Sequence, residues 1–286
     1  MEGKPDIRSD READRHYKGL LALLLLNGDR IETRNHPTLS VIDAPPCFFY
    51  ETPLVTSRKT AWKKSLREME WFLSGNLECP ADLLDWWQDQ LCDDTRYKGP
   101  KRYLYHGGYG AQLRSYGAGA YDQITALIEG LLEHPHSRRL ITTTWNPDTM
   151  SCIAELNDNP KTPATCHGTL LQAFVRNGAL HLKTYQRSAD ILLGVPHNWL
   201  QYWGVLLWLS ARANLKPGSL QWLFGDLHLY DHPSHLEIAH TILDAGPTAC
   251  RAQLHYTPSG DAFKADDFTM VGEIPEPVTT LRPPLL

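Results

Sequence analysis

The amino-acid sequence predicts one domain that combines helices with β-strands, of either the α/β or the α+β class. A length of 286 residues, with 42% hydrophobic residues and nine tryptophans, can supply a sizeable core. Segments with the apolar spacing of helices occur together with shorter runs rich in β-branched and aromatic residues. No internal repeat or linker divides the chain. We therefore expect a flexible N-terminal segment at residues 1–13 and a single domain at 14–286.

The first part of the chain predicts two helices around a β-rich stretch. Residues 14–27 are apolar with helical spacing, and they end before a glycine. Short β-like runs between 34 and 55 are interrupted by prolines. A second helix is expected at 59–73, where apolar residues recur every three to four positions and Gly75 marks the end. Residues 77–108 mix acids, aromatics and glycines, which indicates an irregular segment that contributes to a site.

The second part of the chain predicts the main sheet and the central helix. The expected strands follow from β-type residues, in this order: 139–145, 168–175, a hairpin arm at 178–183, and a strand followed by a loop within 219–230. The expected helices follow from apolar spacing and flanking prolines: 121–134, 198–213 and 232–245. The helix at 198–213 is apolar and aromatic all round, which is typical of a buried central helix.

Charge and cysteine usage exclude several classes of protein. A net charge of −5 argues against a nucleic-acid polymer as partner, because polymer binding draws on excess lysine and arginine. No run of eighteen apolar residues predicts a membrane span, and the polar N-terminus does not resemble a signal peptide. The six cysteines are scattered without a CxxC pair, so we expect reduced thiols in a cytoplasm.

Residues 185–198 carry the strongest functional signal. Arg187 and Ser188 offer a forked cation and a hydroxyl, a pairing suited to a phosphate. Asp190 adds a carboxylate, and Asn198 carries both a donor and an acceptor with which to read the edge of a flat heterocycle. Cys166 lies twenty-one residues before Arg187 and is a candidate nucleophile. Together these residues indicate chemistry on a nucleotide base.

Other functions can be drawn from some of the same residues. Cys166 could serve a cysteine hydrolase, although the adjacent His167 faces another side of a strand, so a remote histidine would be needed. His232 and His235 have no third metal ligand at a convincing spacing, and we expect no metal. The segment 84–87 is either ordinary core or a set of rings that stack on a flat cofactor.

Five ordered motifs resemble the thymidylate synthase family, including its pyrimidine hydroxymethylase branch. The resemblance extends from about residue 17 to 235, with a weaker tail. The motifs are Ser137-Arg-Arg139 with Trp145-Asn146, Cys166-His167, Tyr185-Gln-Arg-Ser-Ala-Asp190, Leu193-Gly-Val-Pro-His-Asn198 and Gly225-Asp-Leu-His-Leu-Tyr230. The resemblance implies an α+β fold with a large mixed β-sheet packed by helices, and a homodimer formed sheet to sheet.

The resemblance also implies a role for each matched position. Cys166 would add to C6 of the pyrimidine, which makes C5 nucleophilic enough to attack a folate-borne one-carbon unit. Glu68 and Tyr109 would serve proton transfers at the base. Asp226 lies in the loop that would bind the deoxyribose 3′-hydroxyl. The other expected substrate contacts are Arg34, Arg138, Arg139, Arg187 and Ser188 for the phosphate, and His228 and Tyr230 for the 3′-hydroxyl.

The expected co-substrate is 5,10-methylenetetrahydrofolate. The residues expected beside it are Asp190, Trp87, Leu84, Gly194 and His197. In this family the twin arginines come from the other subunit, so Arg138 and Arg139 imply an obligate two-fold dimer. Asn198 predicts dUMP as substrate, because one amide satisfies the N3 donor and O4 acceptor of uracil, whereas the cytosine-using branch has an aspartate there.

Departures from the family pattern bear on the product. His197 stands where synthases have phenylalanine, and if Trp87 matches the second ring of the usual WxxW pair, Leu84 replaces the first. A less aromatic and more polar wall admits water to the one-carbon unit. The sequence therefore favours a hydroxymethylase that forms 5-hydroxymethyl-dUMP, an activity suited to the synthesis of modified-base DNA. The alternatives are a thymidylate synthase that forms dTMP and dihydrofolate, and a nucleotide-binding protein without catalysis.

Overall fold

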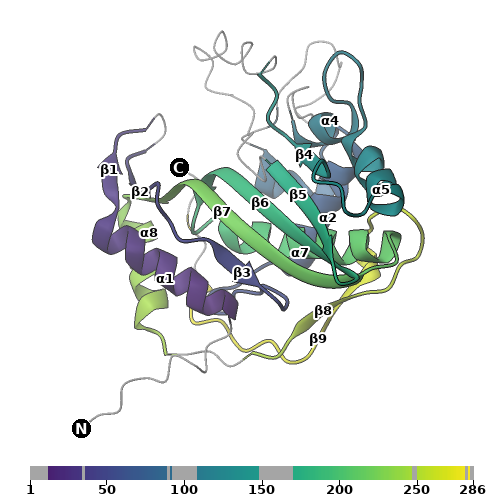
Figure 1. Cartoon of the computed structure of the whole chain (residues 1–286). Helices are drawn as coiled ribbons and strands as arrows, with labels where there is room; N and C mark the ends of the chain where they lie inside the picture. Colours follow the sequence, from purple (N-terminus) through teal and green to yellow (C-terminus); the bar gives the residue numbers. More distant parts are fainter. Residues whose placement is uncertain are drawn as a thin grey trace.

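The computed structural model of the chain has an α+β fold built on one large sheet (Figure 1). It describes residues 12–33, 36–88, 91, 108–147, 170–246, 250–280 and 283. Within them, no helix is long and apolar enough to cross a membrane, and no three metal-binding side chains cluster. The large mixed sheet packed by helices is the architecture that the family resemblance implies.

The main sheet contains seven described strands in the order β1-β2-β7-β6-β5-β4, and β3 pairs with a separate stretch of β7. Its pairs are antiparallel except for β6 and β7, which run parallel. The strands are β1 (Asp29–Ile31), β2 (Thr38–Val41), β3 (Cys47–Phe49), β4 (Ile141–Thr143), β5 (Leu170–Arg176), β6 (Ala179–Asp190) and β7 (Lys216–Tyr230). A separate two-stranded sheet pairs β8 (Gln253–Tyr256) with β9 (Phe268–Val271).

The helices cover one face and the ends of this sheet. Figure 1 shows α2 and α7 behind β5, β6 and β7, while α1 and α8 lie beside β2 and β3. The helices are α1 (Glu12–Asn27), α2 (Trp62–Ser74), α3 (Leu84–Trp87), α4 (Tyr109–Arg114), α5 (Gln123–Glu133), α7 (Val195–Arg212) and α8 (Pro233–Asp244), with short 3-10 turns at η1 (Ala81–Leu83) and η3 (Ala265–Asp267). The expected helices thus form close to their predicted bounds.

Two strands are longer than the sequence predicted. The Asn177-Gly178 turn has positive φ at both residues, 52° and 75°, which suits a tight two-residue hairpin between β5 and β6. The arm after this turn does not stop at residue 183 but continues as β6 to Asp190. Likewise, the expected strand and loop within 219–230 form one continuous strand, β7. The long parallel pairing of β6 with β7 extends both strands.

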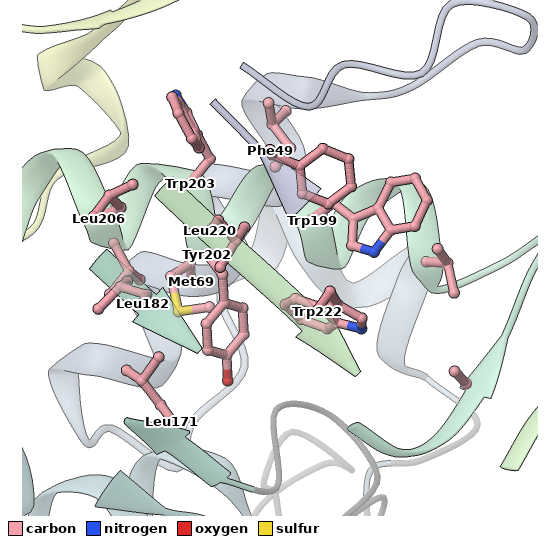
Figure 2. Packing of buried hydrophobic residues seen from close by; sticks show 14 of the residues in the cluster. Phe49, Met69, Leu171, Leu182, Trp199, Tyr202, Trp203, Leu206, Leu220 and Trp222 are labelled. Atoms are coloured by element: carbon pink, nitrogen blue, oxygen red, sulfur yellow. The ribbon is translucent and has the colours of Figure 1, made fainter. Parts of the chain in front are cut away.

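The core lies between the covered face of the sheet and α7. In Figure 2, Leu171, Leu182, Leu220 and Trp222 come from three strands of the sheet, and α7 supplies Trp199 and Leu206 among others. The Trp222 ring meets Tyr202 edge to face at 5.1 Å. Fourteen of the eighteen residues of α7 are buried. Because burying one side chain such as Leu206 contributes about 2 kcal/mol, this helix is the main anchor of the sheet.

Candidate active site

The parallel strands β6 and β7 lie in the middle of the sheet, and the two strongest motifs come together where these strands end. Their register pairs Ser188 with Asp226 and Asp190 with His228. On the other side of β7, the antiparallel strand β2 pairs Ser40 with His228. Motifs separated by almost forty residues in the sequence therefore lie on adjacent strands, at the ends where both strands finish.

A carboxylate-centred cluster lies at the end of β7. The Ser40 hydroxyl donates to Asp226 Oδ1, and His228 Nδ1 lies 3.0 Å from Asp226 Oδ2. Burial would raise the pKa of Asp226, but the bonds from His228 and Ser40 and the charge of Arg187 together lower it. Burial lowers the pKa of His228, yet the bond to Asp226 leaves it raised. The Tyr230 ring meets His228 edge to face at 5.7 Å.

Of the expected phosphate ligands that the structure describes, Arg187 and Ser188 lie near the ends of these two strands. Arg187 is exposed and its guanidinium lies over the ring of Trp145, 5.2 Å from the ring centroid. Ser188 is half-buried beside it. Arg34 lies outside the described residues, as does the candidate nucleophile Cys166.

Arg138 and Arg139 are not brought to Arg187 within the chain. Both are exposed in the turn between α5 and β4. The strand register aligns Ile141 with Gln172 and then with Lys183 on β6. By the same register, Arg139 lies level with the residue of β6 that is six positions before Arg187. The two arginines are therefore about 20 Å apart along the strands.

A chain of hydrogen bonds runs through the buried interior from Trp222 to Glu68. Trp222 Nε1 donates to Gln186 Oε1 at 3.1 Å, and Gln186 Nε2 donates to Asn198 Oδ1 at 2.9 Å. Asn198 Nδ2 then donates to Gln201 Oε1 at 3.2 Å, and Gln201 Nε2 donates to Glu68 Oε2 at 2.5 Å. An indole N–H can only donate, so Trp222 fixes the orientation of both following amides.

This chain leaves the Asn198 amide with a defined hydrogen-bonding edge. Among the described residues, Oδ1 uses one of its two lone pairs, for Gln186, and Nδ2 uses one of its two hydrogens, for Gln201. One lone pair of Oδ1 and one hydrogen of Nδ2 therefore remain for a ligand. The bonds to Gln186 and Gln201 fix which end of the amide accepts and which end donates. Gly194 lies against this amide, because a side chain there would place its Cβ 3.1 Å from Asn198 Oδ1.

Glu68 is a buried carboxylate held among aromatic rings. Its side chain accepts from Trp87 Nε1 as well as from Gln201. Burial raises the pKa of Glu68 to about 7, although these two hydrogen bonds and the charge of Lys64 oppose the shift. The rings of Phe72 and Trp87 contact Tyr109, so the two residues expected to move protons, Glu68 and Tyr109, both contact Trp87. A pKa near neutrality suits general acid and base catalysis.

Asp190 is positioned by the turn that follows β6. Its Oδ1 accepts from the backbone N–H groups of Leu192 and Leu193, at 2.8 and 2.9 Å. Within the described part of the chain, Oδ2 has no hydrogen-bond partner. The turn thus fixes the carboxylate and leaves one oxygen for a ligand that offers N–H groups.

His197 is held by the opposing helix α2 and by an aromatic ring. Its Nδ1 lies 2.8 Å from the Ser65 hydroxyl, and its ring contacts Trp86 at 4.9 Å. Burial lowers the pKa of His197 to about 3, with a further contribution from the nearby charge of Arg58, so the imidazole is neutral. Trp86 is half-buried beside His197, whereas Trp87 is buried with its indole on Glu68. Leu84 is half-buried and packs against the core.

Sequence reasoning missed several residues that support the site. Gln186 lies inside the quoted motif and could have been noticed from its position between Tyr185 and Arg187. Gln201 follows Asn198 by three residues, a helical spacing that places both on one face. The contributions of Ser40 and Ser65 had no sequence signal, because each depends on a contact between distant segments.

These strands and side chains suit a small ligand with an anionic group and a flat polar ring. A family model described as thymidylate synthase matches residues 15–282. This match covers nearly the whole chain, which therefore belongs to the thymidylate synthase family. The protein is accordingly a folate-dependent transferase of one-carbon units to C5 of dUMP.

Proposed function

We propose that this protein converts dUMP into 5-hydroxymethyl-dUMP. Cys166 forms a bond to C6 of uracil, which makes C5 nucleophilic. Methylenetetrahydrofolate supplies the one-carbon unit when bound. Water then adds to the methylene group on C5, and departure of the Cys166 sulfur restores the ring double bond.

The oriented amide of Asn198 supports uracil as the base. Its remaining acceptor matches the N3–H group of uracil, and its remaining donor matches O4. Cytosine presents the opposite pattern and would leave buried polar groups unpaired, at a cost of about 1–3 kcal/mol each. In this proposal Arg187 and Ser188 bind the phosphate of dUMP, and the cluster of Asp226, His228 and Tyr230 binds the hydroxyl of its sugar.

The described residues fit a reduced folate beside this base. Asp190 offers a fixed carboxylate oxygen to the N–H groups of a pterin. Trp86 offers a half-buried ring next to His197 on which a flat heterocycle can stack. These residues would bind and orient the co-substrate, while Glu68 and Tyr109 move protons at the base.

His197 is the observation that carries the choice of product. A neutral imidazole stands directly before the base-reading Asn198, with its Nδ1 engaged by Ser65. A polar ring at this point can hold a water molecule close to the one-carbon unit. The sequence suggested that a missing ring at Leu84 would also admit water, but Trp86 supplies a ring beside His197. The proposal therefore rests on the imidazole alone.

Thymidylate synthase activity is the second candidate, and Trp86 favours it. An aromatic ring beside the reacting carbon excludes water and leaves hydride transfer from the folate as the competing outcome. The products would then be dTMP and dihydrofolate.

The identity of the product tests the proposal. The enzyme is incubated with dUMP and methylenetetrahydrofolate, dihydrofolate is followed by absorbance, and the nucleotide mass is measured. We expect 5-hydroxymethyl-dUMP without stoichiometric dihydrofolate. Cys166→Ala should bind dUMP but show no turnover. Production of dTMP with an equal amount of dihydrofolate would instead establish the synthase.

A further inference from the structure

Two side-chain hydrogen bonds, one helical turn apart, join α2 to α7 inside the site. Ser65 and Glu68 lie three residues apart on α2, and His197 and Gln201 lie four residues apart on α7, so each pair shares one helix face. Ser65 contacts His197, and Glu68 contacts Gln201. Gln201 Nε2 also donates to the backbone carbonyl of Ser65 at 3.0 Å. The imidazole of His197 is therefore one helical turn from the carboxylate of Glu68.

The hydroxyl of Ser65 determines which nitrogen of His197 carries the hydrogen. Ser65 Oγ donates to the carbonyl of Ala61 at 3.0 Å, and a carbonyl can only accept. When the single hydroxyl hydrogen is used there, Nδ1 is the donor in the contact of 2.8 Å with His197. The neutral ring then has its lone pair on Nε2. Among the described residues, Nε2 has no hydrogen-bond partner.

We propose that Ser65 is a positioning residue that locks His197 in the Nδ1–H tautomer, so that Nε2 accepts a hydrogen from the water that attacks the one-carbon unit. This inference rests on the proposed hydroxymethylase function and deepens it. With the opposite tautomer, Nε2 would carry a hydrogen and present a donor. A donor would turn the oxygen lone pairs of the water toward the imidazole and away from the carbon.

The bond changes of this step balance without a further reactant. The water oxygen bonds to the methylene carbon as one O–H bond breaks, and the methylene double bond moves into the ring as an enolate. The enolate restores the C5–C6 double bond as the Cys166 sulfur leaves as a thiolate. The proton passes to solvent water, because the low pKa of His197 makes the imidazole suited to orienting the water rather than to keeping the proton.

The test combines a product ratio with a direct view of the tautomer. The ratio of 5-hydroxymethyl-dUMP to dTMP is measured for wild type and for Ser65→Ala, with Ser210→Ala as the control. Ser210 is a buried serine of α7 whose hydroxyl has no partner in the described structure. We expect the ratio to fall about tenfold in Ser65→Ala, as loss of one orienting hydrogen bond predicts, and to stay unchanged in Ser210→Ala.

The tautomer is read from ¹⁵N spectra of histidine-labelled protein, with the His197 signals assigned by their loss in His197→Phe. We expect wild type to show a protonated Nδ1 and an unprotonated Nε2, and Ser65→Ala to lose this preference. Wild type that gives only dTMP overturns the proposed function and this inference with it. If wild type does form 5-hydroxymethyl-dUMP, two results overturn the role of Ser65 but leave the proposed function standing. One is an Nε2–H tautomer of His197 in wild type, and the other is an unchanged ratio of 5-hydroxymethyl-dUMP to dTMP in Ser65→Ala.

Discussion

At the scale of single residues, the site depends on groups whose ionisation and orientation are set by buried neighbours. Glu68 is only 7% exposed, and its two carboxylate oxygens accept from an indole and an amide. Asn198 is 4% exposed, and its orientation follows from a tryptophan two hydrogen bonds away. Both side chains are therefore held in one orientation before any ligand arrives, which is the basis of a preorganised site.

Glu68→Gln should change both catalysis and the pH dependence of stability. Removing a general acid or base should lower kcat by about 10²–10⁴-fold. The folded-state pKa of about 7 lies above the ordinary value of 4.5, so the contribution of wild-type Glu68 to stability is complete below pH 4.5 and is lost as pH rises through 7. Urea unfolding at several pH values should show that, as pH rises across this range, the free energy of unfolding of the variant increases by at most about 3 kcal/mol relative to that of wild type.

Glu129→Gln, at an exposed glutamate of α5, is the matched control for this measurement. Its free energy of unfolding should follow wild type at every pH. A Glu68→Gln curve parallel to that of wild type would show that the pKa of Glu68 is not raised in the folded protein.

Asn198→Asp should shift the substrate preference from dUMP toward dCMP. A carboxylate cannot donate to O4 of uracil or to Gln201 Oε1, so two hydrogen bonds are lost with uracil. We expect kcat/KM for dUMP to fall by about 10–100-fold, from the loss of about 1–3 kcal/mol, with a smaller loss or a gain for dCMP. Steady-state kinetics with both nucleotides gives the ratio, and an unchanged ratio would place base recognition elsewhere.

At the scale of elements, the close pairing of β6 with β7 positions Arg187 and Ser188, the proposed phosphate-binding residues. Gly225 lies on β7 against β6, and a Cβ there would be 2.5 Å from both the Arg187 carbonyl oxygen and the Tyr185 hydroxyl. Only a glycine allows the two strands to come this close without a shift of the backbone. The position of Arg187 therefore depends on the absence of a side chain on the neighbouring strand.

Gly225→Ala should displace Arg187 and weaken phosphate binding. The Arg187 backbone must move to accept the new methyl group, which should destabilise the fold by about 1–3 kcal/mol. Calorimetric titration should show dUMP affinity lowered by about tenfold, which corresponds to the partial loss of a charge-assisted hydrogen bond. Gly119→Ala is the control, because its Cβ would meet nothing within 4 Å. Equal behaviour of the two variants would contradict this role for Gly225.

At the scale of the whole molecule, the face of the sheet opposite α7 carries exposed apolar residues. Leu170 pairs with Tyr185 across β5 and β6, and Ile141 pairs with Gln172, two residues along β5. Leu170, Tyr185 and Ile141 therefore share this face, where they are 36–41% exposed. We propose that two copies of the chain join at this face, so that Arg138 and Arg139 of one copy reach the phosphate site of the other. In the single chain they lie too far from Arg187.

Mixed dimers should recover activity from two inactive variants. Cys166→Ala and the double variant Arg138→Ala/Arg139→Ala should each show almost no turnover alone. A mixed dimer has one intact site, and random exchange makes half of the dimers mixed, so we expect about a quarter of wild-type activity. Activity is assayed after subunit exchange in mild denaturant, and sedimentation confirms the dimer. The absence of any recovery would contradict arginines shared across an interface.

Several helices, the family and many candidate site residues could be predicted from the sequence, because each follows from residues that are close together in the chain. The helices at 59–73 and 198–213 follow from apolar spacing, and the family follows from five short motifs that occur in the family's order. Arg187, Asn198 and Asp226 could be named because they lie inside those motifs. The ends of β6 and β7 were less predictable, since their length is set by pairing between distant segments.

Residue types and their order determined the fold class, the family and the candidate site residues. Tertiary structure decided the states of those residues. The sequence gives no account of a pKa near 7 at Glu68, the fixed amide of Asn198 or the ring of Trp86 beside His197. Each depends on burial and on a partner from a different element, because hydrogen-bond orientation and desolvation are properties of the assembled interior rather than of any local segment.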